Sequence, residues 1–284
     1  MNNGLIIYIA GYGRSGSTAL DLALSAVCEE AIGCGEVGML PKLYKSPRLG
    51  CSCGAQYPNC SVWSPILRAS NGVGGLRSLT SIYTQDGIGG YFKPPSKSYV
   101  DFWADIFGKR CRYQSIPENR PWVAIDSTKT VIPNASRPYN LSRLPGIEVV
   151  VVHLKRDLRG VLSSRRKGKN SDLEGLPRSK HLVAILSRLF WPVIVPTNWF
   201  LANFFARVSK KSRTTRLAID VDFRELRANP EDVALRVWQE IAESMALPLS
   251  FGPTRAGYAK PDHLVEGNRF VREGHSVSIR SKSR

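Results

Sequence analysis

The sequence is poor in acidic residues, and this shortage sets its charge. It has 23 Asp and Glu against 40 Lys and Arg, which gives a formal net charge of +17. Such a field attracts polyanions in general, including nucleotides, nucleic acids, anionic glycans and membrane surfaces, without choosing among them. Because a hydrophobic content of 43% and a charged content of 22% are ordinary for a globular protein, only the balance of charge points to a partner.

Long apolar runs are also missing. The nearest candidate for a membrane span, residues 181–208, is interrupted by Arg188, two prolines and two asparagines. We expect buried or interfacial helices there, with peripheral contact to a membrane or a lipid-like acceptor as a further expectation. The first residues carry no basic segment ahead of an apolar run, so no signal peptide is expected and a cytoplasmic location is predicted.

Cysteine is too scarce for a disulfide-built scaffold. The chain has six cysteines in 284 residues, and three of them cluster at Cys51, Cys53 and Cys60. A zinc site is one interpretation, in which Cys34 would have to supply the fourth ligand. A local disulfide and buried thiols are the alternatives.

Four short apolar runs alternate with helical patterns along the chain. This alternation predicts an α/β fold with a central, mainly parallel sheet flanked by helices. We expect a single domain over residues 1–284, with a loop-rich region over 40–98 and a helical insertion over 170–210. The expected strands are Leu5–Ala10, Trp122–Ile125, Ile147–Leu154 and Leu217–Asp220.

A glycine-rich turn follows the first expected strand, and a helix follows the turn. We expect Ser17 or Thr18 to cap that helix, which would begin at Ala19. Backbone N–H groups and the helix dipole then converge on one spot, so the turn is a candidate anion site. Its candidate ligands are Gly13, Arg14, Ser15, Gly16, Ser17 and Thr18.

The same turn departs from the nucleotide P-loop at one informative position. The pattern G-x-x-x-x-G-K-S/T matches Gly11, Gly16 and Thr18 but requires lysine where Ser17 stands. Arg14 is the cation of this turn. An ATP- or GTP-dependent phosphoryl-transfer loop is therefore disfavoured, and glycines that merely ease packing are the plainer alternative.

Two further polar residues follow buried segments. Glu36 lies among glycines after the first helix, where it could act as a general base or be a solvated loop residue. Lys129 follows the strand Trp122–Ile125, and ligands of open α/β sheets sit beyond the carboxyl ends of strands. A capping turn is the alternative for Lys129.

A second anion site is predicted after the strand Ile147–Leu154. Arg156 stands at the mouth of the next helix, and Ser164 lies eight residues further, about two turns along and on roughly the same side. An arginine and a hydroxyl so placed can grip one phosphate. We do not expect nucleic-acid binding by this basic run, because aromatic residues do not interleave with it.

The C-terminal part holds one more group of candidates. Its composition is typical of phosphate contacts, with a basic tail as the alternative for Arg269. His263 is a second candidate base, because a neutral imidazole accepts a proton near neutral pH. The residues are His263, Gly267, Asn268 and Arg269.

These passages, taken in order, resemble sulfotransferases that use 3′-phosphoadenosine 5′-phosphosulfate (PAPS), the bacterial, carbohydrate-type branch most of all. Arg14-Ser15-Gly16-Ser17-Thr18 resembles the 5′-phosphosulfate loop of that family. Arg156 with Ser164 resembles its 3′-phosphate site, although Leu158 stands where a proline is frequent. The passage around Gly267-Asn268 resembles the segment that closes over the 3′-phosphate.

The resemblance implies a P-loop-like sulfotransferase fold and in-line transfer of a sulfuryl group from PAPS. The expected acceptor is a hydroxyl, or with less support an amine, of a carbohydrate, glycolipid or small metabolite. It implies that Glu36 is the base, that Arg14 and Lys129 stabilise charge, and that no metal takes part in the reaction. A P-loop-type kinase or NTPase and a non-catalytic nucleotide- or polyanion-binding protein are the rival hypotheses.

Overall fold

The computed structural model covers the expected strands and most of the candidate site. The residues that it describes are 4–40, 51–70, 82, 84–113, 122–167, 191–254, 258–259, 263–265 and 277–278. The candidates Gly267, Asn268 and Arg269 lie outside these residues.

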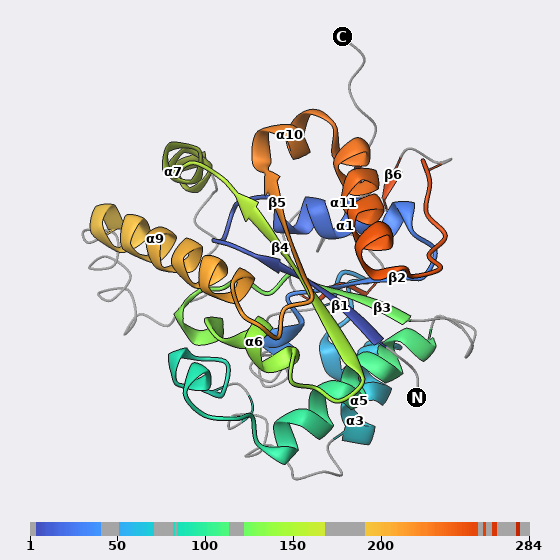
Figure 1. Cartoon of the computed structure of the whole chain (residues 1–284). Helices are drawn as coiled ribbons and strands as arrows, with labels where there is room; N and C mark the ends of the chain where they lie inside the picture. Colours follow the sequence, from blue (N-terminus) through green and yellow to red (C-terminus); the bar gives the residue numbers. More distant parts are fainter. Residues whose placement is uncertain are drawn as a thin grey trace.

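A five-stranded sheet forms the centre of the molecule, with the strand order β2-β3-β1-β4-β5 and every neighbouring pair parallel (Figure 1). The central strand β1 is fully buried, as its run of apolar residues requires. The prediction of an α/β fold with a parallel sheet is confirmed. The strands are β1 (Gly4–Ala10), β2 (Ala31–Gly35), β3 (Trp122–Asp126), β4 (Ile147–Lys155) and β5 (Leu217–Asp222).

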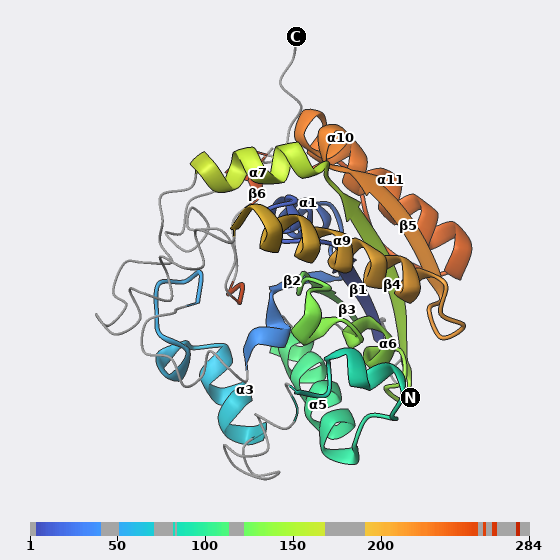
Figure 2. The same ribbon diagram turned by 90° about the vertical axis from the view of Figure 1, so that its left-hand side faces the viewer.

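Helices cover both faces of this sheet (Figures 1 and 2). One face carries α1 (Ser17–Val27), α10 (Phe223–Ala228) and α11 (Pro230–Met245). The other carries α3 (Trp63–Ser70), α5 (Lys97–Tyr113) and α6 (Arg137–Leu141).

Alternate residues of the central strand feed the two hydrophobic cores. Ile7 packs in the core that contains Trp238 of α11, whereas Ile6 packs in the core that contains Trp63 and Trp103. Successive side chains of a strand point to opposite faces, so one apolar run serves both layers.

Two more helices lie beside the carboxyl ends of the strands, α7 (Leu158–Lys167) and α9 (Trp191–Lys210). A small core of Tyr12, Val161, Val195 and Ala202 joins them to the turn after β1. Of the region expected to be helical over 181–208, the part from residue 191 onward forms α9.

The outer side of α9 carries apolar residues. No helix in the described part of the chain combines the length and the apolar character that crossing a membrane requires. Peripheral contact with a membrane stays a prediction. The exposed large apolar residues of α9 are Val193, Ile194, Phe200, Phe204 and Val208.

Short elements complete the described chain. Four are 3-10 helices, and two strands pair antiparallel near the C-terminal end. They are η1 (Val37–Met39), η2 (Tyr57–Asn59), η4 (Ile88–Tyr91), η5 (Ile132–Asn134), β6 (Tyr258–Ala259) and β7 (Val277–Ser278).

The strand β2 was not predicted from the sequence, and two glycines lie inside it. A Cβ atom at Gly33 would lie 2.5 Å from Asp21 Oδ1, and one at Gly35 would lie 2.4 Å from the carbonyl oxygen of Val265. Neighbouring segments therefore press on β2 so closely that glycine is required inside the strand. The glycines allow this close approach. Because glycine is uncommon inside strands, the same residues made β2 hard to predict from the sequence.

Candidate functional site

The candidate residues meet at one end of the sheet, beyond the carboxyl ends of four parallel strands. The turn after β1 carries Arg14, the end of β2 carries Glu36, the turn after β3 carries Lys129 and the end of β4 carries Arg156. Ligands of open α/β sheets bind at this edge.

The turn after β1 differs from the prediction in how it enters the helix. The helix α1 begins at Ser17, and Gly16 is its N-cap residue, with a φ of 93° and no capping side chain. The expectation that Ser17 or Thr18 caps a helix beginning at Ala19 is therefore wrong. Gly16 adopts the left-handed conformation that glycine tolerates, which turns the chain into the helix without a capping side chain.

The backbone of this turn presents a row of free donors. The N–H groups from Gly13 to Thr18 donate to no acceptor in the described part of the chain, and Leu20 N makes the first helical bond, to Gly16 O at 3.0 Å. Arg14 is exposed beside them. Unpaired N–H groups at a helix N-terminus, with its dipole and an arginine, are groups that can bind an anion, so this turn stays the candidate anion-binding turn.

Thr130 fixes the base of this turn. Gly11 N donates to Thr130 Oγ1 at 3.0 Å, and Thr130 N donates back to Gly11 O at 3.2 Å. The same hydroxyl donates to the carbonyl oxygen of Ala202 in α9 at 2.9 Å. Thr130 thus fixes β1, the turn after β3 and α9 to one another, a role that the sequence did not reveal.

Lys129 and Glu36 form an ion pair next to the anion-binding turn. The Lys129 ammonium group donates to Glu36 Oε1, and the two side chains are 18% and 16% exposed. A Cβ atom added to Gly13 would lie 3.5 Å from Lys129 Cδ, so the lysine stem passes directly beside that turn. Glu36 Oε2 accepts no hydrogen bond from any residue that the structure describes.

The backbone around Glu36 is held from three sides. Glu36 N donates to Val265 O at 2.7 Å, and Ser127 N donates to Gly35 O at 2.8 Å. Gly35 N donates to Oδ2 of Asp21, a fully buried residue of α1, at 3.0 Å. Burial raises the pKa of Asp21 to about 8, although hydrogen bonds from Ser127 and Gly35 partly oppose this rise.

Arg156 lies against the anion-binding turn. Its Nη1 donates to the carbonyl oxygen of Arg14 at 2.6 Å, and its guanidinium carbon lies 3.9 Å from the ring centre of Phe223. A Cβ atom at Gly160 would come within 2.9 Å of Arg156 Nε, so Gly160 leaves the space that the guanidinium occupies. Nothing in the sequence signalled this stacking, because Phe223 lies far from Arg156 in the chain.

The remaining candidates are placed less directly at this site. Ser164 lies partly exposed on α7, and the structure shows no hydrogen bond between it and Arg156. His263 directs its ring toward sulfur, because its Nδ1 lies 3.2 Å from Cys60 Sγ.

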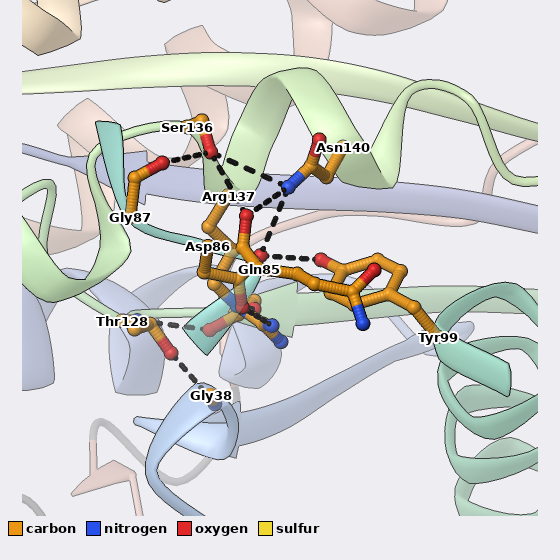
Figure 3. Close-up of polar contacts among 10 residues, drawn as sticks. Gly38, Gln85, Asp86, Gly87, Tyr99, Thr128, Ser136, Arg137 and Asn140 are labelled. Atoms are coloured by element: carbon orange, nitrogen blue, oxygen red, sulfur yellow. Dashed lines mark hydrogen bonds and ion pairs between the residues drawn. The ribbon is translucent and has the colours of Figure 1, made fainter. Parts of the chain in front are cut away.

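A fully buried network lies beneath the turn that carries Lys129 (Figure 3). Arg137 Nε donates to Asp126 Oδ2 and Arg137 Nη1 donates to Asp86 Oδ2, both at 2.8 Å. Asp126 Oδ1 accepts from Thr128 N at 2.9 Å, and Thr128 Oγ1 accepts from Gly38 N at 2.9 Å. This network ties the end of β3 to η1, the short helix that follows Glu36.

Further side chains complete the network around Asp86. Tyr99 OH donates to Asp86 Oδ1 at 2.5 Å, and Asn140 Nδ2 donates to the carbonyl oxygen of Gln85 at 2.9 Å. Ser136 Oγ donates to Gly87 O at 2.7 Å. None of these residues was singled out in the sequence, because they come from separate segments with no shared motif.

Comparison with known proteins gives few matches. No protein-family model matches the chain, and no curated protein matches it. Among solved structures, a sulfotransferase domain from the curacin biosynthetic pathway is similar at 14% identity and a TM-score of 0.48, over 98% of this chain and 85% of that one.

A second solved structure is a sulfotransferase domain from the Synechococcus PCC 7002 olefin synthase. It is 16% identical with a TM-score of 0.33, over 87% of this chain and 74% of that one. At TM-scores this low, neither similarity establishes a function for this chain. The fold defines the chain as a parallel α/β protein that carries a candidate anion site at the strand ends, and its activity is inferred from the side chains.

Proposed function

We propose that this chain transfers a sulfuryl group from PAPS to an acceptor hydroxyl by in-line displacement. One observation carries the proposal. The N–H groups from Gly13 to Thr18, which are unpaired among the described residues, lie close to both Arg156 and the Lys129–Glu36 pair. An anion-binding turn beside a cation and a carboxylate contains the groups that transfer to a hydroxyl requires.

The donor fits the turn because its 5′-phosphosulfate is an anion and the turn offers unpaired donors. When bound, PAPS supplies an activated sulfuryl group with the 5′-phosphate as leaving group. Arg14 and the backbone N–H groups hold and neutralise that phosphate. Lys129 stabilises the negative charge that develops during transfer, and Glu36 accepts the proton that the acceptor hydroxyl releases.

The second anion of the donor, its 3′-phosphate, is assigned to Arg156. The Arg156 side chain is partly exposed, and its guanidinium donates only to Arg14 O among the described residues, so it has further N–H donors to offer. Ser164 is proposed as a further contact. By the resemblance of their motif, Gly267, Asn268 and Arg269 would close over the same phosphate.

The acceptor is proposed to be a hydroxyl of a carbohydrate, a glycolipid or another small metabolite. Trp199 of α9 donates to the carbonyl oxygen of Arg156 at 2.9 Å, so this helix lies next to the site. Its exposed Phe200 and Phe204 therefore favour an acceptor with an apolar part. A cytoplasmic location is part of the same proposal.

A metal-dependent kinase is the main rival, and the environment of Asp126 disfavours it. P-loop kinases hold Mg²⁺ with a carboxylate at a strand end. Here Asp126, the carboxylate at the end of β3 and next to the turn after β1, already accepts hydrogen bonds on both oxygens, from Thr128 N and from Arg137. The lysine of the P-loop pattern is replaced by Ser17.

Calorimetric titration discriminates between these functions. We expect 3′-phosphoadenosine 5′-phosphate to bind more tightly than ATP with or without Mg²⁺. Tighter binding of ATP, or Mg²⁺-dependent ATP hydrolysis, would contradict the proposed sulfuryl transfer. Sulfur-labelled PAPS tested against a panel of hydroxyl acceptors then separates an enzyme from a binding protein, which would bind the nucleotide without turnover.

The role of Arg156 is tested with two ligands and a matched control. We expect Arg156→Ala to weaken the bisphosphate about 10- to 100-fold, the loss of one or two charged hydrogen bonds. Adenosine 5′-phosphate, which lacks the 3′-phosphate, should lose little. Arg159→Ala removes an exposed arginine three residues further along, in α7, and should change neither affinity. Equal losses for both ligands would remove Arg156 from the 3′-phosphate site.

A further inference from the structure

Four ligand-type side chains gather away from the anion-binding turn. The sulfur atoms of Cys51, Cys53 and Cys60 and a ring nitrogen of His263 all lie within 4.8 Å of one another. The Cys60 sulfur lies 3.2 Å from His263 Nδ1 and 3.9 Å from the Cys53 sulfur, and the Cys51 sulfur lies 3.6 Å from His263 Nδ1.

These separations fit a tetrahedral metal site. With Zn–S near 2.3 Å and Zn–N near 2.0 Å, a tetrahedron places two sulfurs about 3.8 Å apart and a sulfur and a nitrogen about 3.5 Å apart. We propose that Cys51, Cys53, Cys60 and His263 bind one zinc ion. Thiolate and imidazole ligands select zinc over the hard cations that prefer oxygen.

The site is structural. All four positions of the tetrahedron are filled by side chains, which leaves no open position for water or substrate. Zinc also accounts for the cluster better than a disulfide does, because the 3.9 Å between the Cys53 and Cys60 sulfurs far exceeds the roughly 2.05 Å of a disulfide bond. Cys53 is exposed, so the ion has a path from solvent.

The backbone around the cysteines fixes these ligands. Cys51 N donates to Ala55 O at 2.9 Å and Gly54 N donates to Cys51 O at 3.0 Å, which forms a tight turn between two of the ligands. Trp63 N donates to Cys60 Sγ at 3.4 Å, and Trp63 Nε1 donates to His263 O at 2.6 Å. Hydrogen bonds of this kind orient metal ligands.

The fourth ligand corrects the assignment made from the sequence. Cys34 lies in β2, where its sulfur approaches the carbonyl oxygen of Ile32 at 3.7 Å. His263 takes its place, more than 200 residues from Cys60 in the chain. The spacing of the cysteines alone could not reveal so distant a partner.

The zinc site would fasten the backbone that positions Glu36. Leu264, the neighbour of His263, accepts from Ser52 N at 3.2 Å and donates to Ser52 Oγ at 2.8 Å. The next residue, Val265, donates to Cys34 O at 2.9 Å and accepts from Glu36 N at 2.7 Å. The ion thus joins the loop 51–60 to the segment beside Glu36, and this inference does not depend on sulfuryl transfer.

Metal content is the first test. The whole chain, purified in the presence of reductant, should contain about one zinc per molecule by elemental analysis. Cys53→Ser and Cys60→Ser should each lose most of it, whereas Cys28→Ser, which changes a buried cysteine outside the cluster, should keep it. Zinc that is absent from the wild type, or unaffected by the two cluster variants, would overturn the site.

A second measurement covers the case in which a cluster variant fails to fold. Wild-type protein stripped by a chelator should bind one equivalent of Co²⁺, with the strong visible bands of tetrahedral thiolate coordination, and zinc should displace it. The thermal unfolding midpoint should fall on stripping and recover with zinc. Absence of these bands, or a mass lower by two hydrogens that marks a disulfide within the cluster, would contradict the proposal.

Discussion

Two ion pairs lie close to the carboxyl end of β3, and they differ most in their access to solvent. Arg137 is paired with Asp126 and Asp86, and all three side chains are fully buried. Lys129, three residues after Asp126, pairs with Glu36, and these side chains are 18% and 16% exposed. Both pairs join the same turn to other segments, but only the second can meet a ligand.

The surroundings of the two pairs match this difference. Burial lowers the pKa of Arg137, but Asp126 and Asp86 raise it more strongly, so the guanidinium stays charged. Trp103 also covers it, with the guanidinium carbon 3.9 Å from a ring centre. Nε and Nη1 of Arg137 both donate to buried carboxylates, so this pair supports the turn, whereas Glu36 Oε2 accepts no hydrogen bond from the described residues.

Removing the buried cation should have the largest effect. We expect Arg137→Met to lower the free energy of unfolding by about 3–5 kcal/mol, because it leaves two buried carboxylates without their partner. Urea unfolding followed by far-UV circular dichroism measures this loss. Arg143→Met, which changes a less buried arginine beyond α6, is the matched control. A loss for Arg137→Met no larger than for the control would contradict the division between the two pairs.

Changes to the accessible pair should affect turnover far more than stability. We expect Lys129→Met and Glu36→Gln each to lower kcat about 100- to 1000-fold, through lost charge stabilisation and lost proton transfer. The free energy of unfolding should change by about 1 kcal/mol or less. Affinity for 3′-phosphoadenosine 5′-phosphate should stay near wild type in Glu36→Gln. Full turnover in Glu36→Gln would refute its role as the base.

The last prediction concerns the pH dependence of stability and Asp21, which holds the strand end before Glu36. Its pKa is about 8 in the folded chain, against an ordinary value of 3.8. Between pH 3.8 and about 8, the folded state keeps a proton on Asp21 that the unfolded state has released. The stability that this proton gives is therefore complete at low pH and is lost as the pH rises toward 8.

Thermal unfolding at several pH values measures this linkage. The midpoint of the wild type should fall relative to that of Asp21→Asn as pH rises from about 5 to about 8. Asp101→Asn, an exposed change on α5, serves as the control. Parallel curves for the wild type and Asp21→Asn would show that Asp21 does not keep its proton in this range.

The strands that the sequence predicted are those whose apolar character is visible locally. β1, β3, β4 and β5 are apolar runs bounded by polar residues or glycines, and all four were predicted within a few residues. The strand β2 was missed because its glycines are imposed by Asp21 and Val265. Contacts with distant segments produce no periodic pattern of apolar residues, so the sequence of β2 does not indicate a strand.

The site divides in the same way. The positions of the glycine-rich turn and of Arg156 at the strand ends were predictable, since both follow directly from local spacing in the sequence. The roles of Thr130 and Phe223 were not, because each depends on a partner brought near only by folding. The Lys129–Glu36 pair is intermediate, with both residues named beforehand and their contact visible only in three dimensions.

The position of His263 also sets a delay between the synthesis of the first three zinc ligands and that of the fourth. Cys60 and His263 are separated by 203 residues, which a ribosome adds in roughly 10–40 s. For that interval the three thiols wait for their fourth ligand, and Gly35 lacks the Val265 bridge that borders β2. Exposed strand edges of this kind invite pairing with other chains. A nascent chain is therefore most prone to aggregation during this interval. The interval ends when His263, the last ligand, has been synthesised.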